Sequence, residues 1–281
     1  MAAEQVILVT GCSSGIGRAT ALEGALRGHR VFASARNRND IADLERRENL
    51  SGIVLDVTDA ASIRAAVDGV LARAGRIDAL VNNAGYAQYG AVEEVSPEEW
   101  RAVFDVNLFG LLEVTRAVLP SMRAAARGTV VLMSSLGGRV SVPFASPYCA
   151  SKHAIEAVAD ALRVETAPFG IRVVTIQPGP IDTRFADRAR SMVGPLVARP
   201  GPYRAFYANA ERAMDGDFRR GHLPPEPVAR VILDAIEAAR PRPRYKVTWL
   251  ARTLIPLKRA LPDRWVDFMM RFSLKLPAGP R

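Results

Sequence analysis

Residues Gln5 to Gly17 read Gln-Val-Ile-Leu-Val-Thr-Gly-Cys-Ser-Ser-Gly-Ile-Gly. The apolar run 5–10 predicts a short strand that is buried on both faces, as in a parallel sheet. A glycine-rich loop follows, and a helical pattern continues to Arg27. In such a unit, glycines let the backbone approach a pyrophosphate, which the free N–H groups of the helix N-terminus bind. The alternative is a turn with only a structural role.

The remainder of the chain alternates short apolar runs with helical patterns, which is typical of an α/β domain. Further strands are predicted at residues 30–34, 52–57, 79–81, 128–133, 171–177 and 245–249. A helix is predicted to begin at Ser96, because Ser96-Pro97-Glu98-Glu99 supplies an N-cap, a first-turn proline and a glutamate that can complete a capping box. Residues 184–227 are rich in Gly, Pro and Arg and are predicted to be irregular. A loop of this length is either a functional lid or a surface excursion.

The composition is that of an ordinary soluble globular protein, with 49% apolar and 24% charged residues among 281. We expect neither a secretory leader nor a membrane span, because no long apolar window occurs. Cys12 and Cys149 are expected to be reduced thiols rather than a disulfide. These features favour a cytoplasmic location, with peripheral attachment to a membrane as the alternative.

The positive charge is concentrated at the C-terminus. Residues 241–281 hold ten Lys and Arg against two Asp, a net +8 of the total +9. Within the tail 251–281, four apolar residues repeat at helical spacing: Trp265, Phe268, Met269 and Phe272. Three roles are open: packing over a cleft or at a subunit interface, resting on an anionic membrane surface, or binding nucleic acid. We expect no nucleic acid, because no nucleic-acid-binding fold accompanies the charge.

The segment Tyr148–Lys152 (Tyr-Cys-Ala-Ser-Lys) opens a helical pattern, which places the phenol and the amine on one face, one turn apart. A phenol ordinarily has a pKa near 10. An ammonium about 4 Å away contributes about 4 kcal/mol at an effective dielectric of 20, which is enough to lower that pKa by about three units. The pair therefore suggests an acid–base site, although an isolated pair of this kind also occurs on surface helices.

Four motifs resemble those of the short-chain dehydrogenases/reductases: Thr-Gly-x-x-x-Gly-x-Gly at 10–17, Asn-Asn-Ala-Gly at 82–85, Tyr148-x-x-x-Lys152, and Pro-Gly-x-x-x-Thr at 178–183. The resemblance covers Gln5 to about Leu250. It implies an α/β fold with a doubly wound, Rossmann-type sheet of seven parallel strands and helices on both faces. Residues 1–250 would form the catalytic domain, with a substrate-covering insertion at about 184–227, and residues 251–281 a basic, amphipathic helical extension.

The resemblance also implies a reaction, the reversible transfer of a hydride between a nicotinamide and a carbonyl or alcohol. The serine that lies thirteen residues before the tyrosine selects Ser135 as a catalytic hydrogen-bond donor beside Tyr148 and Lys152. Asn107 is the fourth catalytic residue, ordering a water that leads to Lys152. A plainer role for Asn107 is a hydrogen bond to the backbone of another element, and the two roles are compatible.

The cofactor is expected to be NADP(H) rather than NAD(H). An NAD enzyme usually has an acid at the end of the second strand, but this chain has Ala35 and Arg36 there, and a guanidinium suits a 2′-phosphate. Ser14 adds a hydroxyl to the same phosphate. The residues expected to hold the cofactor are Gly11, Ser13, Ser14, Gly15, Ile16, Gly17, Arg36, Asp56, Val57, Asn83, Ala84, Gly85, Tyr148, Lys152, Pro178, Gly179, Ile181 and Thr183. No metal is expected.

The substrate is expected to be a bulky apolar carbonyl or alcohol, such as a steroid, retinoid or other lipid. The segment from Ser135 to Phe144 resembles the hydroxysteroid and retinol dehydrogenase branch. Four apolar side chains are expected to line its pocket: Leu136, Val142, Phe144 and Phe185. The alternatives are a 3-ketoacyl-thioester reductase and a non-catalytic NADP(H)-binding regulator. The family resemblance further implies a homodimer or homotetramer.

Overall fold

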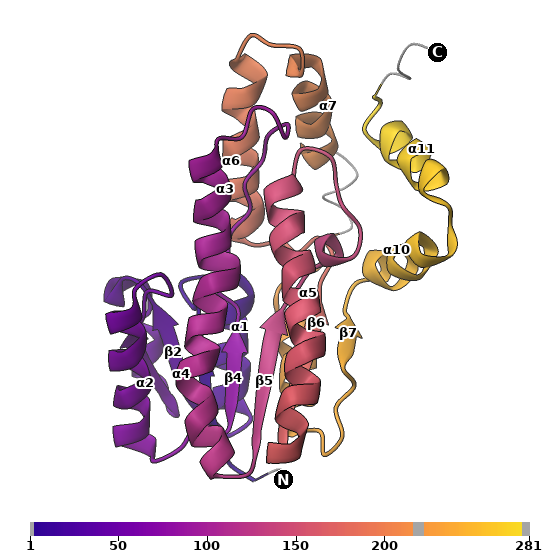
Figure 1. Cartoon of the computed structure of the whole chain (residues 1–281). Coiled ribbons are helices and arrows are strands. Elements are labelled where there is room, and N and C mark those ends of the chain that lie inside the picture. Colours follow the sequence, from indigo (N-terminus) through magenta and orange to yellow (C-terminus); the bar gives the residue numbers. More distant parts are fainter. Residues whose placement is uncertain (1–2, 216–221, 277–281) are drawn as a thin grey trace.

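Seven parallel strands form one sheet in the computed structural model, which describes residues 3–215 and 222–276 (Figure 1). The strand order is β3-β2-β1-β4-β5-β6-β7. The strands are β1 (Val6–Val9), β2 (Arg30–Ala35), β3 (Leu50–Val54), β4 (Ala79–Asn82), β5 (Gly128–Met133), β6 (Ile171–Gln177) and β7 (Arg244–Lys246). The predicted doubly wound α/β fold is therefore confirmed.

The sheet is wound in opposite directions from its centre. Strand β1 pairs with both β2 and β4, so the connections that leave β1 and β4 diverge at the carboxyl edge. This divergence opens a crevice where ligands bind in sheets of this type. The residues of β1 and β5 are all buried, as expected for strands that are covered on both faces.

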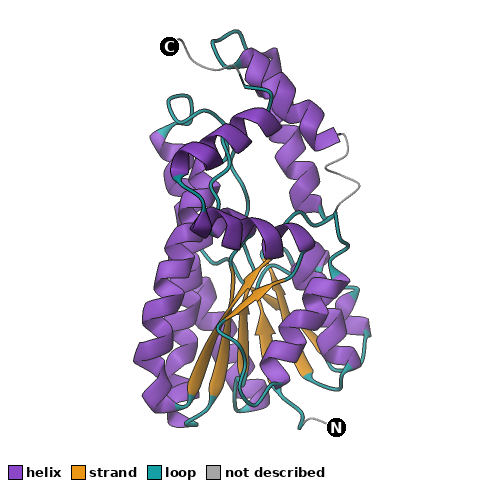
Figure 2. Cartoon of the chain, turned by 90° about the vertical axis from the view of Figure 1, so that its right-hand side faces the viewer, coloured by secondary structure: helices purple, strands orange, loops and turns teal. Residues whose placement is uncertain are grey.

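Helices cover both faces of the sheet (Figures 1 and 2). One hydrophobic core joins the sheet to α2 (Ala60–Ala74), α4 (Leu111–Ala124) and α5 (Ser146–Thr166). A second core joins the opposite face to α1 (Gly15–Leu26) and α9 (Glu226–Glu237). Burial of apolar surface on both faces provides the main stabilisation of the fold.

The capping box predicted at Ser96 is confirmed. The Ser96 hydroxyl accepts from the Glu99 N–H at 3.2 Å, and the Glu99 carboxylate accepts from the Ser96 N–H at 2.8 Å. The sequence suggested one long regular α-helix after Ser96, but the structure shows three consecutive helical segments. They are α3 (Pro97–Phe104), a π-helical segment at Asp105–Gly110, and then α4. Such π-helical segments occur frequently at functional sites.

The expectation of irregular structure across 184–227 was wrong for most of that range. It contains α6 (Arg184–Ala198) and α7 (Arg204–Asp215), while residues 216–221 lie outside the described part of the chain. Val193 and Tyr207 are each only 2% exposed. Tertiary burial of these side chains on the main body therefore outweighs the weak helix propensity of a Gly- and Pro-rich composition.

The final strand is shorter than predicted and leads into two helices. Strand β7 ends at Lys246, because the Thr248 hydroxyl accepts from the Ala251 N–H at 3.1 Å and begins α10 (Trp249–Ala260). Helix α11 (Asp263–Ser273) follows, and residues 277–281 of the extension lie outside the described residues. Within the described ranges, no helix is both long and apolar enough to traverse a bilayer.

Candidate active site

A cavity of about 1620 Å³ opens at the carboxyl edge of the sheet. It is bounded by the loops that follow β1, β4, β5 and β6, and by α6, α7, α10 and α11. Of the residues predicted for the site, all except Gly17 and Asn107 line this cavity. The fold thus brings together segments that are separated by more than a hundred positions in the sequence.

The glycine loop packs so tightly that side chains at its three glycines, Gly11, Gly15 and Gly17, would be strained or would clash. Gly11 and Gly15 have φ angles of +73° and +58°, in the left-handed region that favours glycine. A Cβ at Gly17 would lie 2.4 Å from both the Gly11 carbonyl oxygen and Asn83 Nδ2. Gly17 is absent from the cavity wall for this reason: it lies behind the wall and lets the loop close against Asn83.

Asn83 holds the loop after β4 against the loop after β1. Its amide donates to the carbonyl oxygens of Thr10 at 2.9 Å and Gly11 at 3.1 Å, while the Thr10 hydroxyl accepts from the N–H groups of Asn83 and Ala84. Ser14 occupies the N-cap of α1, but its hydroxyl makes no capping bond. The loop therefore presents a hydroxyl and the free N–H groups of a helix N-terminus to the cavity, a ready site for an anion.

Arg36 and Asp56 lie at the other end of the crevice. Arg36 directly follows β2, is exposed, and forms no ion pair with any described residue. The Asp56 carboxylate accepts from the N–H and hydroxyl of Thr58, and these hydrogen bonds, together with the nearby Arg36 charge, lower its pKa despite partial burial. The guanidinium thus faces the cavity with no carboxylate at the end of β2 to bind a ribose 2′-hydroxyl.

Ser135 and Tyr148 meet at the wall of the cavity. Ser135 precedes a short 3-10 helix, Leu136–Gly138, and its hydroxyl oxygen accepts from the Gly137 N–H at 3.0 Å. Tyr148 lies in the first turn of α5, and its side chain lies beside Ser135, since a Cβ on Gly137 would be 3.2 Å from Tyr148 Cε1 and 3.5 Å from Ser135 Oγ. The spacing of thirteen residues therefore brings these two side chains together in one part of the cavity wall.

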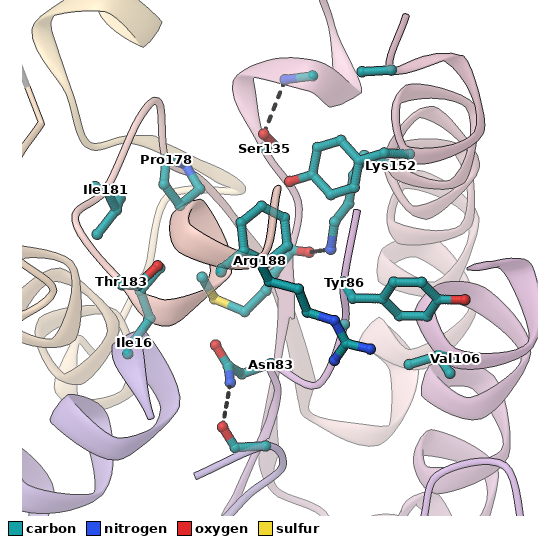
Figure 3. A pocket seen from close by; sticks show the side chains of 18 of the residues that line it. Ile16, Asn83, Tyr86, Val106, Ser135, Lys152, Pro178, Ile181, Thr183 and Arg188 are labelled. Atoms are coloured by element: carbon teal, nitrogen blue, oxygen red, sulfur yellow. Dashed lines mark hydrogen bonds between the residues drawn. The ribbon is translucent and has the colours of Figure 1, made fainter. Parts of the chain in front are cut away.

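Lys152 is buried one turn along α5 from Tyr148, with 6% of its surface exposed. Its ammonium donates to the Met133 carbonyl oxygen at 2.7 Å and lies 5.7 Å from the centre of the Tyr148 ring. Desolvation lowers the pKa of Lys152 to about 8. Figure 3 shows Lys152 and Ser135 bordering one space, with Pro178, Ile181 and Thr183 across from them.

The predicted pKa shift of Tyr148 was wrong in direction. Burial raises its pKa above the ordinary value, and the polar Ser135 side chain nearby offsets only part of this rise. The predicted decrease required a fully protonated Lys152 amine close to the Tyr148 hydroxyl. In the structure that amine is directed at Met133 and is itself partly deprotonated near pH 8, so desolvation outweighs the attraction.

Asn107 lies behind the cavity wall rather than in it and is fully buried. Its side chain accepts from the Tyr86 N–H at 3.0 Å and donates to the Tyr86 carbonyl oxygen at 2.9 Å and to the Ser151 hydroxyl at 3.0 Å. The plainer of the two predicted roles, a hydrogen bond to the backbone of another element, is confirmed. Asn107 thereby holds the Tyr86 backbone, in the loop after β4, against α5 next to Lys152.

The loop after β6 closes the cavity opposite Tyr148. The Pro178 carbonyl oxygen accepts from the Leu136 N–H at 2.7 Å, which joins this loop to the Ser135 segment. A Cβ at Gly179 would lie 2.3 Å from the Thr248 hydroxyl, so only glycine fits there. Thr183 lies directly over Gly15, because a Cβ on that glycine would contact the Thr183 side chain at 3.0 Å.

The sequence profile of the family described as short chain dehydrogenase matches residues 5–194. The chain belongs to the short-chain dehydrogenase family. It is accordingly an oxidoreductase that acts on CH–OH or C=O groups.

Three relatives of this short-chain dehydrogenase illustrate the range of substrates in the family. The 3-ketodihydrosphingosine reductase of Bacteroides thetaiotaomicron is 33% identical, with 95% of this chain and 97% of the relative covered. The NADPH-dependent 3-dehydrocapnine reductase of Ornithobacterium rhinotracheale is 34% identical, with 95% and 96% covered. Human 17-beta-hydroxysteroid dehydrogenase type 1 is 33% identical, with 93% and 82% covered.

Solved structures of short-chain dehydrogenases have the same fold. A Streptomyces avermitilis enzyme superposes with a TM-score of 0.80 at 31% identity, covering 97% of this chain and 98% of that one. A Burkholderia phymatum enzyme in complex with NAD gives 0.78 at 27% identity, with 95% of each chain covered. Actinorhodin polyketide ketoreductase with NADPH gives 0.76 at 33% identity, with 90% and 100% covered. Neighbours of this chain thus bind NAD or NADP.

The outer part of the cavity in this short-chain dehydrogenase is apolar. Phe185 lies with its ring centre 5.6 Å from that of Tyr148. Phe144 packs against Tyr203, which directly precedes α7, and against Phe206 and Tyr207 in the first turn of that helix. The remaining predicted liners, Leu136 and Val142, border the same space. A large apolar chamber therefore continues outward from the two hydroxyl groups.

Several lining residues were missed from the sequence. Arg188 on α6 lies 5.5 Å from the Tyr86 ring centre and crosses the crevice above Asn83 (Figure 3). The C-terminal helices contribute another group to the wall: Leu250, Leu254, Met270, Ser273 and Leu274. The helical spacing of Leu250 and Leu254 indicates an apolar side on α10. Tertiary contacts decide that this side faces the cavity.

Proposed function

We propose that this protein interconverts a ketone or aldehyde and an alcohol on a bulky, apolar, lipid-like substrate, with NADP(H) as cofactor. The observation that carries the proposal is that Ser135 and Tyr148 lie side by side in the cavity wall, where the polar crevice of the glycine loop meets the apolar chamber. A substrate carbonyl at this junction would reach both hydroxyl groups, while its apolar remainder would fill the chamber.

The crevice fits a dinucleotide. Gly11 and Gly17 let the glycine loop pack tightly against Asn83 and Ala84, and the cavity side of this loop is where a pyrophosphate would approach the backbone. The N-terminus of α1 and Ser14 would bind phosphate groups, Asp56 and Val57 would flank the adenine, and the segment 178–183 would flank the nicotinamide. When bound, the nicotinamide supplies or accepts the hydride.

The protein contributes alignment and proton transfer. In the reducing direction, the Ser135 hydroxyl donates a hydrogen bond to the substrate oxygen as negative charge develops on it. Tyr148 delivers the proton to that oxygen. Its raised pKa keeps the phenol protonated at neutral pH, which is the form that an acid requires. Lys152 would hold the ribose hydroxyls, and Asn107 supports the wall beside it.

The pH dependence should reflect Lys152. Its pKa of about 8 means that the ammonium loses its proton above this pH, so we expect kcat/KM for NADPH to fall by up to about tenfold per pH unit there. Lys152→Arg keeps a cation to much higher pH and should shift the falling limb upward. A profile that stays flat from pH 7 to 10 in the wild type, with a stable fold, would contradict this role.

Arg36→Asp should reverse the cofactor preference. The substitution replaces the donor for a 2′-phosphate by an acceptor for a 2′-hydroxyl, and hydrogen bonds to charged groups contribute about 1.5–3 kcal/mol. We expect the ratio of kcat/KM for NADPH to that for NADH to fall by roughly tenfold or more. Arg38→Asp is the control, because that neighbouring arginine pairs with Glu45 and does not line the cavity. An unchanged ratio in Arg36→Asp would overturn the assignment.

The substrate class is tested by NADPH consumption with matched sets of ketones. Long-chain 3-keto lipids and steroid ketones represent the proposed class, and 3-ketoacyl thioesters represent the alternative. The apolar chamber favours the first set, and the names of the sphingosine and steroid relatives are consistent with it. Exclusive turnover of thioesters would favour the alternative, and cofactor binding without any turnover would favour a regulator.

A homodimer or homotetramer is the oligomeric state that we propose. Val164 on α5 is 70% exposed, and Phe169 just beyond that helix is 44% exposed. A face that presents such side chains is suited to pairing with a second copy. Light scattering of the purified protein tests this proposal, and a monomer at micromolar concentration would refute it.

A further inference from the structure

The outer faces of α10 and α11 expose large aromatic side chains. Trp249 is 75% exposed, Trp265 61%, Phe268 60% and Phe272 77%. On α11 the last three lie at helical spacing on one side, and the rings of Phe268 and Phe272 are 6.3 Å apart. We call Trp265, Phe268 and Phe272 the aromatic face; Trp249 is a further exposed aromatic residue, at the start of α10. Apolar groups gathered in this way on a surface mark a binding site for a partner or a membrane.

Cations border the aromatic face. In residues 249–276, two acids, Asp263 and Asp267, are outnumbered by six basic residues: Arg252, Lys258, Arg259, Arg264, Arg271 and Lys275. Only Lys258 of these six forms an ion pair within the described part of the chain, with Asp263. The remaining five cations are exposed, and two of them, Arg264 and Arg271, lie on α11 directly before Trp265 and Phe272. Trp and Phe on one side with Lys and Arg beside them is the pattern of helices that lie on anionic lipid.

The inner sides of the same two helices form part of the cavity wall. Leu250 and Leu254 of α10 and Met270 of α11 line the cavity, and Ala251 packs with Leu136 and Val140 next to Ser135. Each helix therefore has one side on the apolar chamber and another in solvent. Figure 1 shows both helices beside the carboxyl edge of the sheet, away from the strand ends near the N-terminus.

We propose that the aromatic face binds the surface of an anionic phospholipid membrane, so that the chamber behind α10 and α11 receives its substrate from the bilayer. The binding stands on the exposed face alone, whereas the delivery of substrate rests on the proposed function. Charge excludes a second copy as the preferred occupant, because a two-fold contact through this face would bring like cations together. An anionic surface instead neutralises them and accommodates the tryptophan and phenylalanine rings.

Flotation with lipid vesicles tests the binding. One set of vesicles is phosphatidylcholine alone, and the other contains phosphatidylserine as well. The wild-type protein should bind the anionic vesicles roughly tenfold or more tightly than the neutral ones, and added salt should weaken this binding. The double substitution Phe268→Ser and Phe272→Ser should remove the binding, and Arg264→Gln with Arg271→Gln should remove the preference for anionic lipid.

Leu26→Ser is the matched control, because Leu26 is 81% exposed on α1, outside the cavity and the C-terminal helices. It should bind vesicles as the wild type does. None of the substituted aromatic residues lines the cavity, so turnover of a small water-soluble ketone should be unchanged in the Phe268/Phe272 variant. The same variant should reduce a vesicle-embedded ketone several-fold more slowly.

Failure of wild-type protein to bind anionic vesicles would overturn the proposal, as would equal binding by the Phe268/Phe272 variant. If light scattering shows that this variant dissociates an oligomer that does not bind vesicles, a second copy covers the face and the proposal fails. The two proposals fail separately: vesicle binding without turnover of any ketone refutes the proposed function, and turnover without vesicle binding refutes the membrane site.

Discussion

Tyr148→Phe is expected to lower kcat for ketone reduction by about 10²–10⁴, the contribution typical of a positioned acid–base group. The substitution removes the hydroxyl that lies in the cavity wall beside Ser135 and that we propose as the proton donor. The ring, the glycine loop and α5 should keep their places, so the affinity for NADPH should change by no more than a few-fold. Steady-state rates, together with NADPH titration by fluorescence, measure both quantities.

Tyr89→Phe is the matched control for this experiment. Tyr89 lines the same cavity and burial raises its pKa to about 12, so it shares these two properties with Tyr148 but is not one of the predicted catalytic residues. We expect it to change kcat by less than about tenfold. Near-wild-type turnover in Tyr148→Phe would remove Tyr148 from the mechanism, and equal losses in both variants would indicate a general effect on the cavity.

Glu156→Gln is expected to lower the free energy of unfolding by about 2–3 kcal/mol. The carboxylate is buried on α5 and accepts from Arg139 at 2.7 Å, Arg244 at 2.9 Å and Gln177 at 2.7 Å. Loss of one partner in a buried ion pair costs about 3–5 kcal/mol, and we reduce this value because both arginines remain partly exposed to water. Denaturant unfolding at pH 7 measures the change.

The pH dependence of this effect has a definite sign. Burial raises the pKa of Glu156, but its hydrogen bonds and the charge of Arg139 lower it by more, so the net shift is downward from 4.5. A depressed pKa means that the stabilisation is present above about pH 4.5 and is lost as the pH falls through the lower, folded-state value. The difference between wild type and Glu156→Gln should therefore shrink in acid.

Glu165→Gln supplies the control, because Glu165 is exposed in the last turn of the same helix. It should change stability by no more than about 0.5 kcal/mol. Equal denaturation midpoints for wild type and Glu156→Gln at pH 7 would show that the carboxylate charge is dispensable. The three hydrogen bonds that Glu156 accepts help to position the active site, because they join α5 to the segment after Ser135, to β6 and to β7.

The fold and the family could be predicted from the sequence because their signals are local. Buried apolar runs, the glycine loop at 10–17 and the capping box at Ser96 depend on neighbouring residues only. The predicted seven-stranded sheet is confirmed by the structure, and membership of the short-chain dehydrogenases by the family match. The roles of Ser135, Tyr148, Lys152 and Asn107 in catalysis remain predictions, and the variants above test those of Tyr148 and Lys152.

Tertiary structure decided what no local pattern contains. Burial of the phenol sets the direction of the Tyr148 pKa shift, and packing of Val193 and Tyr207 makes helices of a segment whose composition suggested irregular structure. The periodicity of the tail revealed an amphipathic helix but not which side is covered. The sequence alone determined the order of elements and the residues available for chemistry. Contacts between distant segments desolvate Tyr148 and Lys152. They also decide which side of each C-terminal helix faces the cavity and which faces solvent.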